Sequence, residues 1–306
     1  MVLRIDPRQR KTLVLEVQSL TRRFGDRTVL DEVSFAVPAD GMTGFVGANG
    51  AGKTTTMRII MGVLKSHSGT VYFNGTQLAD TDRARFGYMP EERGLYPKQQ
   101  VLDQLQYLGQ LHGMSRADAR TEALQLLDRF GIADRTKDKL ESLSLGNQQR
   151  VQVAASLMHH PTALILDEPF SGLDPLAVDS MTSLLAERAA TGVPILFSSH
   201  QLDLIDALCD NLVVLAGGKI VASGTATALR ARASAKHVVV TPPDAGWLRE
   251  QPGVRVLDVA GPRALVEFDD EGTAQRILRI AVDRGAVTEF APQRPSLAEI
   301  YREVIR

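Results

Sequence analysis

Residues 47–54 read GANGAGKT, which fits the pattern G-x-x-x-x-G-K-[ST]. A short apolar stretch lies before this segment, and a helical pattern follows it. Glycines in such a loop allow close approach of the backbone, so that successive N–H groups can surround a phosphate at the helix N-terminus. Lys53 adds a positive charge for the outer phosphates, and Thr54 offers a hydroxyl to Mg²⁺. The residues of this phosphate loop that we expect to bind nucleotide are Gly47, Asn49, Gly50, Gly52, Lys53, Thr54 and Thr55.

A second stretch, TALILDEP at 162–169, ends a nearly continuous apolar run with two acids. A nucleotide-bound Mg²⁺ needs a second anchor, and Asp167 is expected to hold the ion directly or through water. Glu168 is expected to orient and polarise the attacking water. The ordinary alternative is a helix-capping or solvated acidic pair. The phosphate loop upstream favours the catalytic interpretation.

Apolar runs of strand length alternate with helical patterns through much of the chain. MTGFVG at 42–47, TALILDEP, VPILFSSH at 193–200 and NLVVLAGG at 211–218 indicate strands of a parallel sheet covered by helices. Three of these strands deliver polar residues at their carboxyl ends, namely the phosphate loop, the acidic pair and His200. Ligands bind at that edge of open α/β sheets. Residues 100–113 and 116–131 show helical periodicity, with Ser115 as N-cap and Gly131 as stop of the second helix.

The pattern changes near residue 230. Beyond it the sequence predicts a small α+β domain of ferredoxin-like type, with elements in the order strand, helix, strand, strand, helix, strand and a last helix. The first of these helices is expected at 245–251 (AGWLREQ). We therefore expect two domains, 1–230 and 231–306.

Composition limits the function classes. The chain has 306 residues, of which 44% are hydrophobic and 23% charged, and its formal net charge is −1. No apolar run reaches the roughly 18 to 20 residues of a spanning helix, and no secretory signal is visible. Cys209 is the single cysteine, which fits a reducing cytoplasm. The charge balance and the lack of a basic stripe argue against a nucleic-acid partner.

One further stretch narrows the family. LSLGNQQR at 143–150 lies just before the strand that carries Asp167. Together with GANGAGKTT, LILDEPFSGLDP and SSH, in this order, it resembles the ATP-binding-cassette (ABC) family over roughly residues 12–230. The resemblance implies an ATPase that uses ATP and Mg²⁺ to power membrane transport. It also implies a P-loop cassette with a mainly parallel core sheet, an antiparallel β subdomain and a helical subdomain at about 98–160.

The resemblance also assigns roles to individual residues. Phe24 matches an aromatic that stacks on adenine. Ser144 and Gly146 match the signature motif, which contacts the γ-phosphate held by the other cassette of a dimer. Asp174 matches the loop that communicates across the dimer. His200 matches the histidine that contacts the γ-phosphate and the attacking water.

Two positions depart from the family pattern. In FGYMPEERGLYP (86–97), Glu91 stands where the family usually has a glutamine that helps to bind Mg²⁺. A carboxylate can also ligate Mg²⁺. In the signature, Leu145 and Asn147 replace the usual Gly and Gln. These departures, with the C-terminal ending SLAEIYREVIR, resemble bacterial cassettes linked to sodium extrusion and to drug or antibiotic efflux.

One phosphate loop and one signature motif in a single chain imply a dimer of cassettes, identical or paralogous, that closes on ATP. Membrane permease subunits, encoded separately, would hold the cassettes at the cytoplasmic face of the membrane. Two other functions remain open at this point. One is a non-transport ABC ATPase that acts on ribosomes, DNA or cofactor assembly, although the tandem cassettes or coiled-coil insertions of such proteins are not seen. The other is a regulatory nucleotide-binding subunit with weak turnover.

Overall fold

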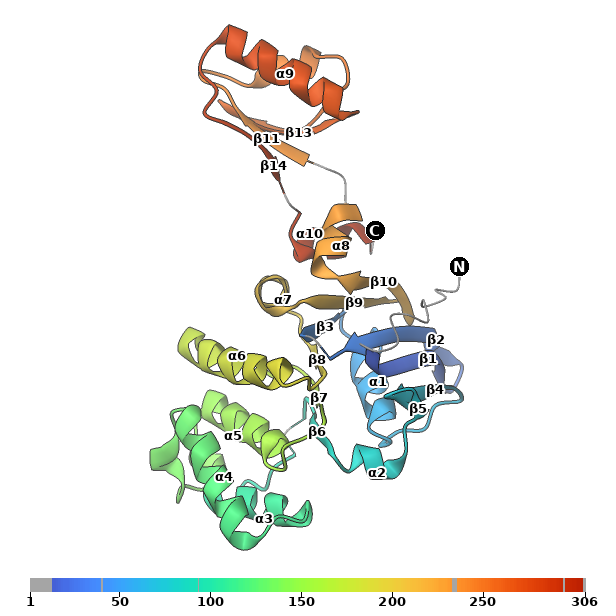
Figure 1. The fold of residues 1–306 in the computed structure, drawn as a ribbon, viewed down its shortest axis with the longest axis vertical. Helices are drawn as coiled ribbons and strands as arrows, with labels where there is room; N and C mark the ends of the chain where they lie inside the picture. The colour runs from blue at the N-terminus through green and yellow to red at the C-terminus, as the bar shows by residue number, and fades with distance from the viewer. Residues whose placement is uncertain (1–12, 40, 93, 233–235, 294, 305–306) are drawn as a thin grey trace. The chain divides into compact units, whose positions relative to one another are not determined.

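The structure is a computed structural model, and it describes residues 13–39, 41–92, 94–232, 236–293 and 295–304. The described residues form two compact units (Figure 1). The first unit ends at Ala226, and the second spans Thr227–Val304. Among the described residues, no helix is both long enough and apolar enough to cross a bilayer.

The core of the first unit is a mixed sheet. Its strands, in spatial order, are β10 (Lys219–Thr225), β9 (Asn211–Ala216), β3 (Met42–Val46), β8 (Ile195–Ser198), β7 (Ala163–Leu166) and β6 (Phe86–Met89). All neighbouring pairs are parallel except β9 and β10. Every residue of β3, β7 and β8 is buried. This confirms the prediction that the apolar runs form a mainly parallel sheet that is covered on both faces.

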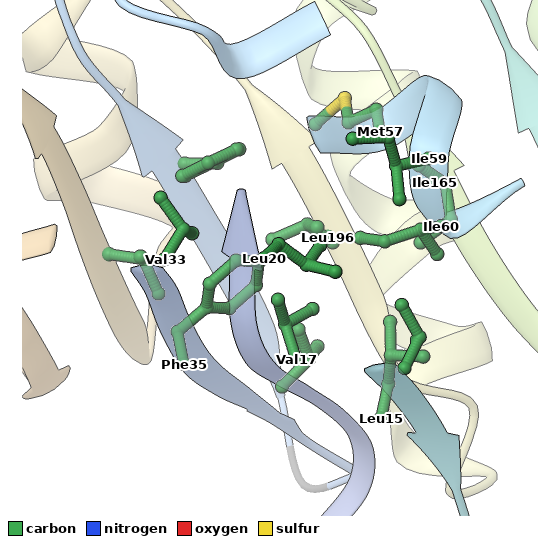
Figure 2. Close-up of a cluster of buried hydrophobic side chains, with 14 of the residues drawn as sticks. Leu15, Val17, Leu20, Val33, Phe35, Met57, Ile59, Ile60, Ile165 and Leu196 are labelled. Carbon is green, nitrogen blue, oxygen red and sulfur yellow. The ribbon is translucent and has the colours of Figure 1, made fainter. Parts of the chain in front are cut away.

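An antiparallel sheet lies beside the core sheet. Its strands, in spatial order, are β2 (Arg27–Pro38), β1 (Leu13–Phe24), β4 (Ser68–Phe73) and β5 (Thr76–Gln77). The helix α1 (Lys53–Ile60) packs its buried face into a cluster that both sheets share. Figure 2 shows Met57 and Ile60 of α1 among Val17 and Phe35 of the antiparallel sheet and Leu196 of the core sheet. Each such side chain contributes roughly 1.5–3 kcal/mol of stability through burial.

The remaining elements of the first unit are mostly helical. They are α2 (Asp80–Arg83), α3 (Val101–Leu111), α4 (Arg116–Arg129), the 3₁₀ helices η2 (Ala133–Arg135) and η3 (Leu140–Ser142), α5 (Leu145–Leu157), α6 (Pro175–Ala190) and α7 (Leu202–Leu208). α3, α4 and α5 contact one another and form a helical layer (Figure 1). The Ser115 side chain accepts a hydrogen bond from the Asp118 N–H and so caps α4, as the sequence predicts.

The second unit contains an antiparallel sheet. In spatial order its strands are β12 (Val254–Ala260), β13 (Arg263–Phe268), β11 (Lys236–Val240) and β14 (Glu289–Gln293). The first strand in the chain therefore lies between the third and the fourth, which is the ferredoxin-like order. The other elements are α8 (Ala226–Arg232), the 3₁₀ helix η4 (Gly246–Glu250), α9 (Glu271–Arg284) and α10 (Leu297–Val304).

The helix expected at 245–251 is present, but it is shorter and is the 3₁₀ helix η4 (Gly246–Glu250) instead of an α-helix. Five residues complete little more than one turn, too few to stabilise an α-helical nucleus. The 3₁₀ turn still buries Leu248 in the core of the second unit, against Val239 of β11, Val266 of β13 and Ile277 of α9. Trp247, the single tryptophan of the chain, packs against this cluster.

This arrangement predicts that Ile277→Ala lowers the unfolding free energy of the second unit by about 2–5 kcal/mol. Ile277 is fully buried, so the substitution leaves a cavity. Trp247 fluorescence during urea denaturation reports the transition of this unit selectively. Val282→Ala, at a side chain of the same helix that is 59% exposed, is the matched control and should change little. Equal shifts for the two variants would contradict the packing described here.

Candidate functional site

Three loops meet at one edge of the core sheet because β3, β7 and β8 are parallel neighbours. In the ladder Phe45 pairs with Ser198, and Leu166 pairs with Phe197. The phosphate loop after β3, the acidic pair after β7 and the segment after β8 therefore start at the same level. The structure thus brings together residues that lie up to about 150 positions apart in the chain.

The phosphate loop is held closely by its surroundings. A Cβ on Gly47 would lie 2.4 Å from the Leu215 carbonyl oxygen, so only glycine fits there. Gly52, the N-cap of α1, has a φ of 113°. The Lys53 side chain is buried, and its Nζ donates to the Gly47 carbonyl at 2.7 Å. Among the described residues its hydrogen-bond partners are carbonyls. A buried ammonium of this kind at a helix N-terminus favours an anionic ligand.

Asp167 and Glu168 are tied together by one serine of the neighbouring strand. The Ser198 hydroxyl donates to Asp167 Oδ1 at 2.5 Å and accepts the Glu168 backbone N–H at 2.8 Å. Ser198 is fully buried and Asp167 is 1% exposed. Burial raises the pKa of the nearby Tyr88 hydroxyl, and the negative charge of Asp167 raises it further. Tyr88 therefore stays neutral beside the carboxylate.

Glu168 has an uncommon backbone conformation, with a φ of 54°. Left-handed backbone of this kind costs about 1–3 kcal/mol in a residue other than glycine. Its carbonyl accepts a hydrogen bond from Gln149 Nε2 of α5 at 2.9 Å. Its carboxylate lies 2.9 Å from His200 Nδ1. The Glu168 side chain is 13% exposed and that of His200 is 57% exposed, so the pair lies at the mouth of the site.

A cleft of about 330 Å³ opens between the phosphate loop and the acidic pair. It is lined by Phe24, Arg27, Val29, Asn49, Gly50, Gly52, Lys53, Thr54, Thr55, Glu91, Asp167 and Glu168. Most of the residues expected to bind nucleotide or Mg²⁺ are in this set. Phe24 is 48% exposed, and the Arg22 guanidinium lies 4.6 Å from the centre of its ring. Arg27 and Val29 were missed by the sequence analysis, since they belong to a β-strand without a motif.

The oxygen atoms around the cleft fit a magnesium ion. Asp167 Oδ2 is buried and has no hydrogen-bond partner among the described residues. Glu91 Oε2 lies 3.5 Å from Thr54 Oγ1, which places a hydroxyl and a second carboxylate nearby. Within the described ranges, no group of three or more His, Cys, Asp or Glu side chains could hold a metal by itself. Mg²⁺ in nucleotide sites commonly uses one or two carboxylates with substrate phosphates.

Five residues expected at the nucleotide do not line this cleft as far as the chain is described: Gly47, Ser144, Gly146, Asp174 and His200. Ser144 is the N-cap of α5, and its hydroxyl accepts the Asn147 N–H at 3.3 Å. Gly146 lies in the first turn of the same helix. Asp174 caps α6 and forms an ion pair with Arg150 at 3.2 Å. Ser144 and Gly146 thus lie at a helix N-terminus that is not part of the described lining of this cleft.

Two further residues that hold the acidic pair were not predicted from the sequence. Ser198 stands in the SSH segment, and Gln149 stands inside the LSLGNQQR segment. Both residue types can donate a hydrogen bond, but their partners lie 19 to 31 positions away in the chain. No local signal in the sequence identifies those partners.

The chain is similar to ATP-binding subunits of ABC transporters. The family model of the ABC transporter matches residues 30–171, and that of the C-terminal domain of DrrA1-3-like ATP-binding proteins matches residues 224–305. The ABC transporter ATP-binding protein YhaQ of Bacillus subtilis is 37% identical over 95% of this chain and 98% of its own length. The linearmycin resistance ATP-binding protein LnrL of Bacillus subtilis is 30% identical over 74% of each chain. A solved ATP-binding subunit of an ABC transporter superimposes with a TM-score of 0.66 at 33% identity, covering 72% of this chain and 92% of the other.

We expect Ser198→Ala to lower the unfolding free energy of the first unit by about 1–3 kcal/mol. The substitution removes the donor to the Asp167 carboxylate and the acceptor of the Glu168 N–H, both in a buried environment. The measurement is urea denaturation followed by far-ultraviolet circular dichroism, with Trp247 fluorescence marking the second unit. Ser183→Ala, at an exposed position of α6, is the matched control. A loss of stability no larger than that of this control would contradict the proposed hydrogen bonds.

Proposed function

This chain belongs to the ABC transporter ATP-binding proteins, and from that premise we propose that its cleft binds Mg²⁺-ATP and hydrolyses it with Glu168 as the residue that activates water. Proteins of this family bind and hydrolyse ATP to power a transporter, and this chain is such a subunit. The observation that carries the proposal is the convergence of Lys53, Asp167 and Glu168 on one cleft.

The phosphate loop would bind the phosphate chain of ATP. Its N–H groups face the ligand from the N-terminus of α1, where the helix dipole favours negative charge. Lys53 is already held in place by the Gly47 carbonyl, so little side-chain entropy is lost when a phosphate oxygen becomes its counter-ion. Phe24 is exposed at the rim of the cleft and would stack on the adenine.

Thr54, Asp167 and Glu91 would hold Mg²⁺. The unpartnered Asp167 Oδ2 supports this assignment, because a buried carboxylate oxygen without a donor is costly unless a cation neutralises it. When bound, the ion neutralises charge on the phosphates of the substrate. Ser198 keeps the other Asp167 oxygen engaged and leaves Oδ2 for this role.

Glu168 would orient the attacking water and accept its proton as the water oxygen bonds to the terminal phosphorus and the bond to the leaving ADP oxygen breaks. His200 lies within hydrogen-bond distance of the Glu168 carboxylate and would fix its direction. We propose that His200 would also contact the terminal phosphate and the attacking water. The low exposure of Glu168 limits competing contacts with bulk water.

We further propose that two cassettes form the working ATPase. Ser144 and Gly146 lie at the N-terminus of α5, outside the chain's own cleft, where they would contact the terminal phosphate bound to a partner cassette. Asp174 at the start of α6 would lie at the same interface. A symmetric dimer completes two sites at once, so ATP favours the closed state through its affinity for both chains.

The transporter would be an exporter. The similarity to a linearmycin resistance protein supports this direction, as do Glu91 and the altered signature. Separately encoded permease subunits would hold the cassette at the cytoplasmic face of the membrane. Co-expression in cells with the permease that co-purifies with this chain, followed by measurement of ATP-dependent movement of a drug out of the cells, tests the direction. ATP-dependent accumulation inside the cells would overturn it.

Glu168→Gln should lower kcat by a factor on the order of 10² to 10⁴, while ATP binding persists. The amide keeps the shape of the side chain but cannot accept the proton of water, so an ATP-bound dimer should accumulate. Steady-state ATPase assays and size-exclusion chromatography with ATP check both outcomes. Glu187→Gln, at an exposed ion pair on α6, is the control and should retain the parent rate. A Glu168→Gln rate equal to that of the parent would remove Glu168 from the mechanism.

Lys53→Ala should weaken ATP binding by about 10-fold to 100-fold, because a charged hydrogen bond to phosphate is lost. Titration calorimetry with ATP measures the change. Lys137→Ala removes an exposed lysine and should bind ATP like the parent. Unchanged affinity in Lys53→Ala would show that nucleotide binds elsewhere.

A further inference from the structure

The backbone of Glu168 depends on contacts from distant parts of the chain. Its left-handed φ of 54° is unfavourable for a residue with a Cβ, and the following Pro169 restricts the backbone further. Local sequence therefore works against this conformation. Because the direction of a side chain follows its backbone, whatever holds the backbone also determines where the carboxylate points.

Besides the local Ser171 N–H, which donates to the Glu168 carbonyl at 3.2 Å, two distant elements contact the Glu168 backbone. Ser198 of β8 accepts the Glu168 N–H at 2.8 Å. Gln149 of α5 contacts the other side, where its Nε2 donates to the Glu168 carbonyl at 2.9 Å and to the Pro169 carbonyl at 3.0 Å. The Gln149 side-chain amide thus donates to two successive carbonyls. These hydrogen bonds fix the turn where the chain leaves β7.

α5 also contacts a second loop of the site. One turn after Gln149, the buried Gln152 donates through Nε2 to the Pro90 carbonyl at 2.8 Å. The loop after β6, which carries Glu91, is therefore tied to the same helix. The N-terminus of this helix carries Ser144 and Gly146, which are proposed to reach the ATP of the partner cassette.

We propose that Gln149 is a positioning residue, which holds the Glu168 turn so that the carboxylate faces His200 and the cleft. Through this hydrogen bond, the helix that serves the partner's ATP also sets the catalytic carboxylate of its own chain. The inference rests on the proposed function, since it requires Glu168 to activate water. Gln149 itself touches neither substrate nor Mg²⁺ in this proposal.

The test uses two variants of the full chain that both lack the N–H donor. Gln149→Glu keeps the shape of the side chain, and Gln149→Met keeps its length without charge. We expect kcat to fall by about 10-fold to 100-fold in both, because a displaced catalytic group loses its attack geometry. KM for ATP should stay within about threefold, since the phosphate loop is intact. As in Glu168→Gln, the dimer should persist in ATP.

Gln125→Met, at an exposed position of α4, is the matched control and should have the parent kcat. A parent kcat in both Gln149 variants would overturn the inference. A parallel loss of ATP affinity, dimerisation and thermal stability would also overturn it, because such a loss indicates a general structural role.

Glu168→Gln is assayed alongside the Gln149 variants. If Glu168→Gln loses ATP hydrolysis while the Gln149 variants keep the parent kcat, only this inference fails. If Glu168→Gln turns over normally, the proposed function fails first.

Discussion

The common direction of β3, β7 and β8 is the constraint on which the site depends. Parallel strands present their carboxyl ends at one edge of a sheet, so loops from distant parts of the chain meet without any long excursion. The buried apolar residues of these strands stabilise the sheet, and the polar residues just beyond them are those proposed to bind and hydrolyse ATP. Reversing a single strand would move its loop to the opposite edge and separate the phosphate loop from the acidic pair.

In the proposed dimer, the chain would contribute halves of two different sites. The phosphate loop, Asp167 and Glu168 surround one cleft, whereas the N-terminus of α5 lies outside it. Hydrogen bonds from Gln149 and Gln152 connect these halves within the chain. A helix bonded at two points cannot rotate freely against the core sheet, so a displacement at its start is passed to both loops. In the proposed dimer, this geometry would link the occupancy of one nucleotide to the alignment of residues around the other.

The sequence predicts the fold well wherever local chemistry determines it. The phosphate loop, the buried strands, the Ser115 cap and the ferredoxin-like second unit could all be recognised from spacing and composition. The helical pattern after the phosphate loop corresponds to α1, which ends at Ile60, two residues before Gly62 with its φ of 73°. The geometry of the candidate site could not be predicted from the sequence in the same way. The φ of Glu168 and its bonds to Gln149 and Ser198 arise from tertiary packing, and the roles of the site residues remain predictions.

The strand order of the second unit has a consequence for how this module can vary. Its first and last strands are neighbours, and Lys236 at the start of β11 pairs with Gln293 at the end of β14. The chain therefore enters and leaves the sheet at the same corner. In sequence, the sheet lies between α8 and α10. Topologically the segment is a large insertion between two helices. Recombination could exchange it, shorten it to a turn or replace it with another fold without rerouting the rest of the polypeptide.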